Sequence, residues 1–177
     1  MTNDDTNLEV DSSALHEAAH AVAAFENAMT FISLRLKPSI STRKIPTNAD
    51  ISYSWFVHEG ESCSNVLERR LIVALAGPAW EKFSLGTSVT CRTVLNREKD
   101  DRIAAVSLIR ELYRHGVRGN ERKACVQGAW KAAQDLVSRR NAAIITVAYQ
   151  LEIEGELDDS QVRLLLSEEV GTAETQG

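Results

Sequence analysis

Two histidines lie four positions apart near the start of the chain, in the stretch HEAAH, and a glutamate directly follows the first of them. Residues at positions i and i+4 share one face of a helix, so His16 and His20 can direct both imidazoles at one point. Zinc accepts neutral imidazole nitrogen and is usually tetrahedral in proteins. His16 and His20 are therefore candidate ligands of a zinc ion.

Glu17 stands beside the first candidate ligand and has the chemistry of a general base. A catalytic zinc site uses three protein ligands and leaves one position for a water molecule, whose pKa the metal lowers to about 7. A carboxylate close to the ion, yet not bound to it, can take a proton from that water and pass it to a leaving amine. The competing interpretation is an ordinary helix with two surface histidines, which the pentapeptide by itself does not exclude.

A zinc site of this kind needs a third protein ligand from a distant part of the chain. The candidates are Glu81, Asp100, Asp101, His58 and His115. Residue spacing does not choose among them, because the tertiary fold brings the third ligand to the other two.

The remaining sequence predicts a mainly α-helical domain with a small β-hairpin or sheet. Helices are expected over 11–27, 62–85, 97–115, 120–154 and 158–166, and antiparallel strands over 31–37 and 51–57. Pro78 is expected to kink or restart its helix, and the long helix is expected to bend near Ser138. The segment 86–96 is predicted to be a loop with some β character. Ile103, Val106 and Ile109 form a helical stripe that is expected to be core.

Composition and charge limit the classes of function. The chain has 177 residues, of which 44% are hydrophobic and 25% charged, so a single globular domain is expected. A net charge of -5 argues against general binding of nucleic acid or of a membrane surface. The three cysteines are scattered, which suits reduced thiols in the cytoplasm. The longest apolar run, LIVALAG at 71–77, is too short to cross a bilayer.

Four segments of the chain form an ordered series: HEAAHAV, LAGPAWE, KDDRIAAVSLIREL and AYQLEIEGELDDSQV. Over residues 12–166 this series resembles the peptidase domain of the FtsH-type ATP-dependent zinc metalloproteases. The resemblance implies a zincin-like helical peptidase domain over 11–167, between disordered tails at 1–10 and 168–177. It implies Zn2+ as the cofactor and places Asp101 on the family's metal-binding aspartate. Glu81 is the runner-up third ligand, or it holds a ligand histidine in the required tautomer.

Several positions depart from the family pattern. Ala19 replaces a glycine, and Pro78 and Trp80 replace an arginine and an alanine. Asp100 replaces an asparagine, so two neighbouring carboxylates compete for the ligand role. The chain contains no phosphate-binding Gly-x-x-x-x-Gly-Lys-Ser/Thr loop and no membrane anchor is expected. The resemblance therefore implies the zinc hydrolase core alone.

Two functions follow as expectations. The first is a stand-alone zinc metallopeptidase that hydrolyses peptide bonds of a peptide or unfolded protein through a zinc-activated water, with Glu17 as the general base. The second is a non-proteolytic scaffold or oligomerising interaction module that keeps the fold. Apolar side chains on the helices predicted over 97–115 and 120–154 favour a homo-oligomer if they are exposed. The intact Glu17 favours catalysis, because this side chain contributes nothing to folding.

Overall fold

The protein is mainly helical and contains a small antiparallel sheet, as its sequence pattern predicts. A computed structural model describes residues 10–37, 48–54, 62–86, 90–96 and 100–174. In chain order, its elements are α1 (Ser12–Glu26), β1 (Thr30–Lys37), β2 (Asn48–Ser54), α2 (Cys63–Leu85), α3 (Cys91–Asn96), α4 (Asp100–Arg114), α5 (Gly119–Arg139), α6 (Asn141–Glu154), β3 (Glu156–Asp158) and α7 (Asp159–Glu174).

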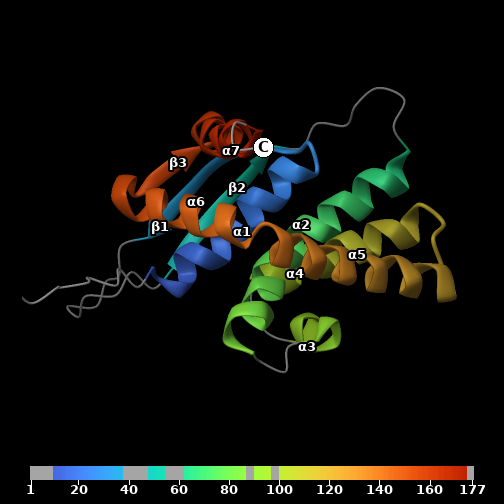
Figure 1. The fold of residues 1–177 in the computed structure, drawn as a ribbon. Coiled ribbons are helices and arrows are strands. Elements are labelled where there is room, and N and C mark those ends of the chain that lie inside the picture. The colour runs from blue at the N-terminus through green and yellow to red at the C-terminus, as the bar shows by residue number, and fades with distance from the viewer. Residues whose placement is uncertain (1–9, 38–47, 55–61, 87–89, 97–99, 175–177) are drawn as a thin grey trace, which may run out of the picture.

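Helix α1 is the central element of the fold. The Asp11 carboxylate caps it by accepting a hydrogen bond of 2.7 Å from the backbone N–H of Ser13. Figure 1 shows the sheet and α7 on one side of α1, and α2, α4 and α5 on the other. The buried residues of α1 are mostly alanines, namely Ala14, Ala18, Ala19, Ala21, Ala23 and Ala24. Small side chains let the surrounding elements approach α1 closely, and this packing holds the helix rigidly in place.

The sheet has three strands in the order β2-β1-β3, and both pairings are antiparallel. Leu34 of the middle strand is fully buried and lies opposite Ile51 on one side and Leu157 on the other. The predicted antiparallel strand pair is confirmed, although β2 begins at Asn48 and residues 55–57 lie outside the described part. The three-residue strand β3 was not predicted. It follows Gly155, whose positive φ of 74° ends α6.

Helix α2 runs without interruption through Pro78, so the predicted restart at this residue is wrong. The Ser62 hydroxyl caps its first turn, and Gly86 ends it with a φ of 58°. Leu71 and Leu75 are fully buried. Packing against neighbouring helices on several sides compensates for the unfavourable proline.

The structure differs from the predicted local structure at three places in the second half of the chain. The segment predicted as a loop contains α3, where the Thr90 hydroxyl accepts a hydrogen bond of 3.1 Å from the backbone N–H of Thr93. The predicted long helix is divided at Arg140 into α5 and α6, close to the predicted bend. Helix α7 extends to Glu174 and therefore includes much of the segment predicted as a tail. The predicted tail over 1–10 lies outside the described residues except for its last position.

The predicted core stripe of α4 is wrong at its first member, because Ile103 is 68% exposed. The residues of α4 that are buried are instead Ala105, Leu108 and Leu112. The buried face begins at the small residue Ala105 and therefore lies to one side of the stripe that begins at Ile103.

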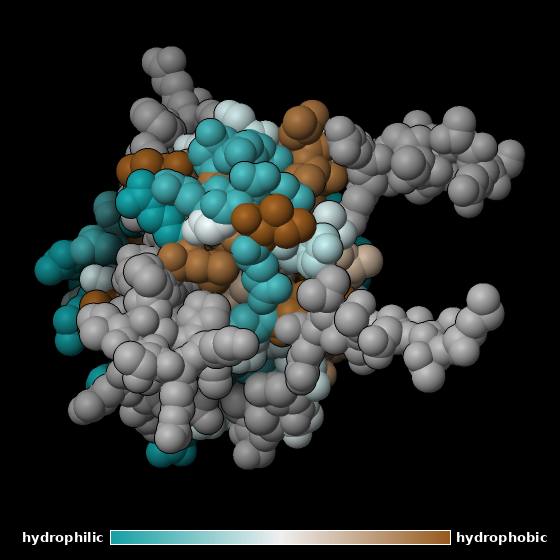
Figure 2. Space-filling model, turned by 90° about the vertical axis from the view of Figure 1, so that its left-hand side faces the viewer, coloured by the Kyte–Doolittle hydropathy of each residue, from teal (hydrophilic) through white to brown (hydrophobic). Residues whose placement is uncertain are grey.

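The surface carries exposed apolar side chains on α4 and α6, which lie within the helical segments that the sequence predicts over 97–115 and 120–154. They are Ile103 and Tyr113 on α4, and Ile145, Tyr149 and Ile153 on α6. On the face in Figure 2, the described apolar side chains form separate areas between hydrophilic ones. Within the described residues, none of the helices combines the length and the apolar character that a membrane span requires.

Candidate metal centre

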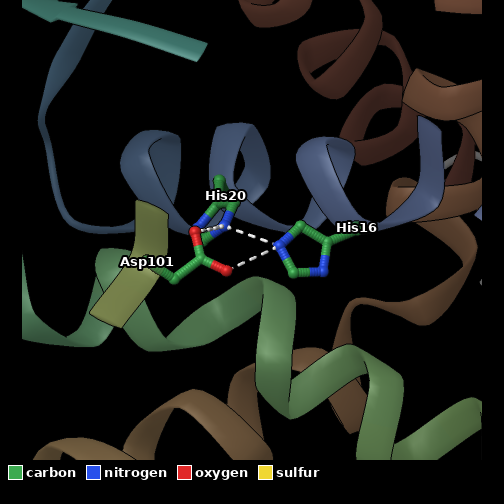
Figure 3. A group of neighbouring side chains, drawn as sticks. All are labelled: His16, His20 and Asp101. Carbon is green, nitrogen blue, oxygen red and sulfur yellow. Dashed lines mark hydrogen bonds and ion pairs between the residues drawn. The ribbon is translucent and has the colours of Figure 1, made fainter. Parts of the chain in front are cut away.

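Two helices bring three side chains with metal-binding chemistry to one point. His16 and His20 extend from α1, and Asp101 extends from the first turn of α4 (Figure 3). The two Nε2 atoms of the histidines lie 3.2 Å apart. The Asp101 carboxylate lies 3.0 Å from Nε2 of His16 and 3.3 Å from Nε2 of His20. Their side chains are 12%, 3% and 19% exposed for His16, His20 and Asp101, so the group is largely screened from water.

The outer nitrogen of each imidazole has a partner that can only accept a hydrogen bond. Nδ1 of His20 lies 2.7 Å from the carbonyl oxygen of Val73, and Nδ1 of His16 lies 3.1 Å from Oε1 of Glu81. With a cation at the centre, each neutral ring would therefore carry its hydrogen on Nδ1 and present the Nε2 lone pair to the ion, whereas without a cation both Nε2 atoms face the Asp101 carboxylate. Such partners fix the orientation and the tautomer of metal-binding histidines.

The spacing of the inner nitrogen and carboxylate oxygen atoms fits a small divalent cation. Zinc bonds of about 2.0–2.1 Å in tetrahedral geometry separate two ligand atoms by about 3.4 Å. The separation of 3.2 Å between the two Nε2 atoms lies close to this value. So do the separations of 3.0 Å from Nε2 of His16 to Oδ2 of Asp101 and of 3.3 Å from Nε2 of His20 to Oδ1 of Asp101. Two lone pairs and a carboxylate repel one another at such distances, so the cluster needs a positive charge between its members. Imidazole and carboxylate are both donors that zinc accepts.

The pKa values of the cation-free cluster reflect the same need for a positive charge among its members. Burial alone would lower the pKa of His16, but hydrogen bonds to Asp101 and Glu81 outweigh it and raise the pKa to about 10. Burial also opposes the charged form of His20, whose pKa is nevertheless raised by the charge of Asp101. Burial would raise the pKa of Asp101, yet the two histidines hold it well below its usual range. The site therefore attracts a proton when no metal ion occupies it.

Gly77 of α2 lies directly against both imidazoles, a role that the sequence did not reveal. A Cβ atom added to Gly77 would lie 2.4 Å from Nε2 of His16 and 2.5 Å from Nε2 of His20. These distances are far below van der Waals contact, so only glycine fits this position. The signal available in the sequence was an isolated glycine inside a helical segment, which usually has a packing or functional reason.

The other candidates for the third ligand occupy different environments. Glu81 contacts the outer nitrogen of His16, where it can orient the ring. His115 is exposed and follows the far end of α4, about 20 Å along the helix from Asp101. His58 and the side chain of Asp100 lie outside the described residues.

Glu17, the candidate general base, is half-buried on α1 beside the first histidine. Its charge contributes to the raised pKa of both His16 and His20. Glu17 is not part of the group of three whose ligand atoms lie within 4.8 Å of one another. Its carboxylate is therefore close enough to influence the centre electrostatically while His16, His20 and Asp101 supply the inner atoms.

A pair of neighbouring substitutions distinguishes the two aspartates. Asp101→Asn is expected to weaken zinc binding by about 10–100-fold or more, because it replaces the charged member of the inner group. Asp100→Asn is the matched control and is expected to retain wild-type affinity. Competition with a chromophoric chelator measures both affinities. A stronger loss in Asp100→Asn would move the ligand role to the preceding residue.

Comparison with protein-family models gives no match for this chain, and comparison with curated proteins gives no similar sequence. A function must therefore be inferred from the chemistry and geometry of the site itself. The group of His16, His20 and Asp101 is the part of the described structure in which at least three potential metal ligands converge.

Proposed function

We propose that the protein is a zinc metallopeptidase with a zincin-like helical peptidase domain. His16, His20 and Asp101 hold the zinc ion, and Glu17 is the general base. The observation that supports this proposal most strongly is the convergence of two Nε2 lone pairs and a carboxylate from segments 85 residues apart. The ordered series of segments that resembles the FtsH-type peptidase domain, and that includes these residues, favours the same reaction.

Different residues of the chain have different roles in the proposed peptide hydrolysis. A zinc ion held by His16, His20 and Asp101 would supply Lewis acidity that lets a water molecule lose a proton near neutral pH. Glu17 accepts that proton as the water oxygen adds to the scissile carbonyl carbon. It then delivers the proton to the amide nitrogen, so that the C–N bond breaks and a carboxylic acid and an amine are released. Glu81 and the carbonyl of Val73 keep the two imidazoles oriented throughout.

The proposed substrate is an extended peptide or an unfolded protein. β2 is an outer strand of the described sheet, and α1 packs against both β1 and β2. An extended peptide can pair with an outer strand through backbone hydrogen bonds, largely independently of its sequence. A segment bound along this side of the sheet would run near the helix that carries His16, Glu17 and His20.

Metal analysis combined with a hydrolysis assay tests the proposal. The protein, purified without chelators, is expected to contain about one zinc ion per chain and to cleave casein. Chelation should stop the cleavage, and added zinc should restore it. Failure to take up zinc would contradict the metal centre. Stoichiometric zinc without hydrolysis of casein or unstructured peptides would instead favour the non-proteolytic scaffold.

A further inference from the structure

Pro78 occupies an unusual place in α2, one residue after the glycine that touches both imidazoles. Proline lacks a backbone N–H, so the carbonyl of Ala74 has no donor four residues later in the helix. The proline ring also presses against that carbonyl. Proline is the least favourable residue in a helix interior, yet α2 continues on both sides of it and buries it. This cost to the helix suggests a compensating role nearby.

The carbonyl of Val73, in the same turn, binds a side chain of another helix. Its oxygen lies 2.7 Å from Nδ1 of His20, which is buried and belongs to α1. A helical carbonyl ordinarily points along its own helix toward the N–H four residues later, which here belongs to Gly77. Prolines and inserted side chains are the recognised causes of local opening of a helix. Both causes are present in this turn of α2: Pro78 removes a backbone donor, and the ring of His20 contacts the Val73 carbonyl.

We propose that Pro78 is a positioning residue of the metal centre. It loosens α2 between Val73 and Gly77, so that the Val73 carbonyl can turn toward α1 and accept the hydrogen of His20 Nδ1. That hydrogen bond orients the Nε2 lone pair toward the ion. The same loosening lets the backbone at Gly77 lie against both rings. This inference rests on the proposed zinc centre and concerns how the protein prepares it.

Two substitutions that restore the backbone N–H test the role of Pro78. Pro78→Ala reduces the side-chain volume and Pro78→Val increases it, so an effect common to both reports the restored N–H. Both variants are expected to bind zinc at least tenfold more weakly in competition with a chromophoric chelator. Their metal-free forms are expected to unfold at the wild-type temperature or higher, because a better helix former replaces proline. A merely structural proline would lower that temperature.

Ser84→Ala provides the control on the same helix. It removes the 3.0 Å hydrogen bond from the Ser84 hydroxyl to the carbonyl of Trp80, away from His20, and should leave zinc affinity unchanged. The ¹H chemical shift of the His20 Nδ1–H in the zinc-bound protein provides a spectroscopic measurement: it should move upfield in both proline variants, because the hydrogen bond to the Val73 carbonyl is weaker. Wild-type affinity in either variant, or a lower unfolding temperature in both, would overturn the inference. Absence of zinc binding in the wild type would instead refute the proposed function.

Discussion

Gly77→Ala is expected to abolish zinc binding and hydrolysis. The added methyl group would lie 2.4 and 2.5 Å from the Nε2 atoms of His16 and His20, where carbon and nitrogen need well over 3 Å. The ring of His20 is buried and that of His16 is mostly buried, on a helix that is packed on several sides, so they cannot both move away while keeping their outer hydrogen bonds. The inner atoms would separate from the positions that match a tetrahedral ion.

Zinc content after gel filtration and affinity in chelator competition measure this effect. Gly128→Ala is a matched control, because Gly128 is also helical and an added Cβ would meet only Glu68 Oε1 at an ordinary distance of 3.9 Å. This control is expected to bind zinc normally and to be more stable by about 0.4–1 kcal/mol, since alanine favours the helix. Stoichiometric zinc in Gly77→Ala would show that the rings adopt another arrangement when the ion is bound.

Glu17→Gln is expected to lower the rate of peptide hydrolysis by a factor of about 10²–10⁴ while the protein keeps its zinc. Glutamine has nearly the shape of glutamate but cannot accept a proton at neutral pH. The inner group of His16, His20 and Asp101 is unchanged, so zinc stoichiometry should be retained. The rate of casein cleavage and the zinc content of the same preparation measure the two effects separately.

Glu26→Gln is the control on the same helix. The Glu26 carboxylate pairs with Arg140 at 3.1 Å, at the opposite end of α1 from the metal centre. The substitution is expected to leave hydrolysis at the wild-type rate and to change stability by no more than about 1 kcal/mol. Undiminished cleavage in Glu17→Gln would mean that another group accepts the proton from water.

Local patterns were sufficient to predict most helices, the antiparallel strand pair and the relation of His16 to His20. These features depend on residues near one another in the chain: side-chain periodicity, caps and prolines act within one or two turns. The i and i+4 spacing on α1 placed two imidazoles on one face without any knowledge of the fold. The prediction failed for α3, which was expected to be a loop, and for Ile103, which was expected to be buried. Both depend on contacts with residues that are distant in the sequence.

The third residue of the site could not be predicted from local sequence patterns alone. Spacing left five residues open, and only the resemblance to a family selected Asp101. The approach of α4 to α1 brings that carboxylate to the histidines and leaves His115 at the far end of its helix. Such an arrangement depends on how helices pack, which contacts between residues distant in sequence determine.

The environment of the metal centre depends on tertiary structure almost entirely. Glycine at position 77, the Val73 carbonyl and the Glu81 carboxylate act on the histidines through contacts across α1 and α2. The position of a backbone carbonyl cannot be predicted from residue types. A glycine inside a helix indicates that another group packs closely against it, but it does not indicate which group. The chain encodes the types of chemical group locally, whereas packing of α1, α2 and α4 decides which of those groups meet.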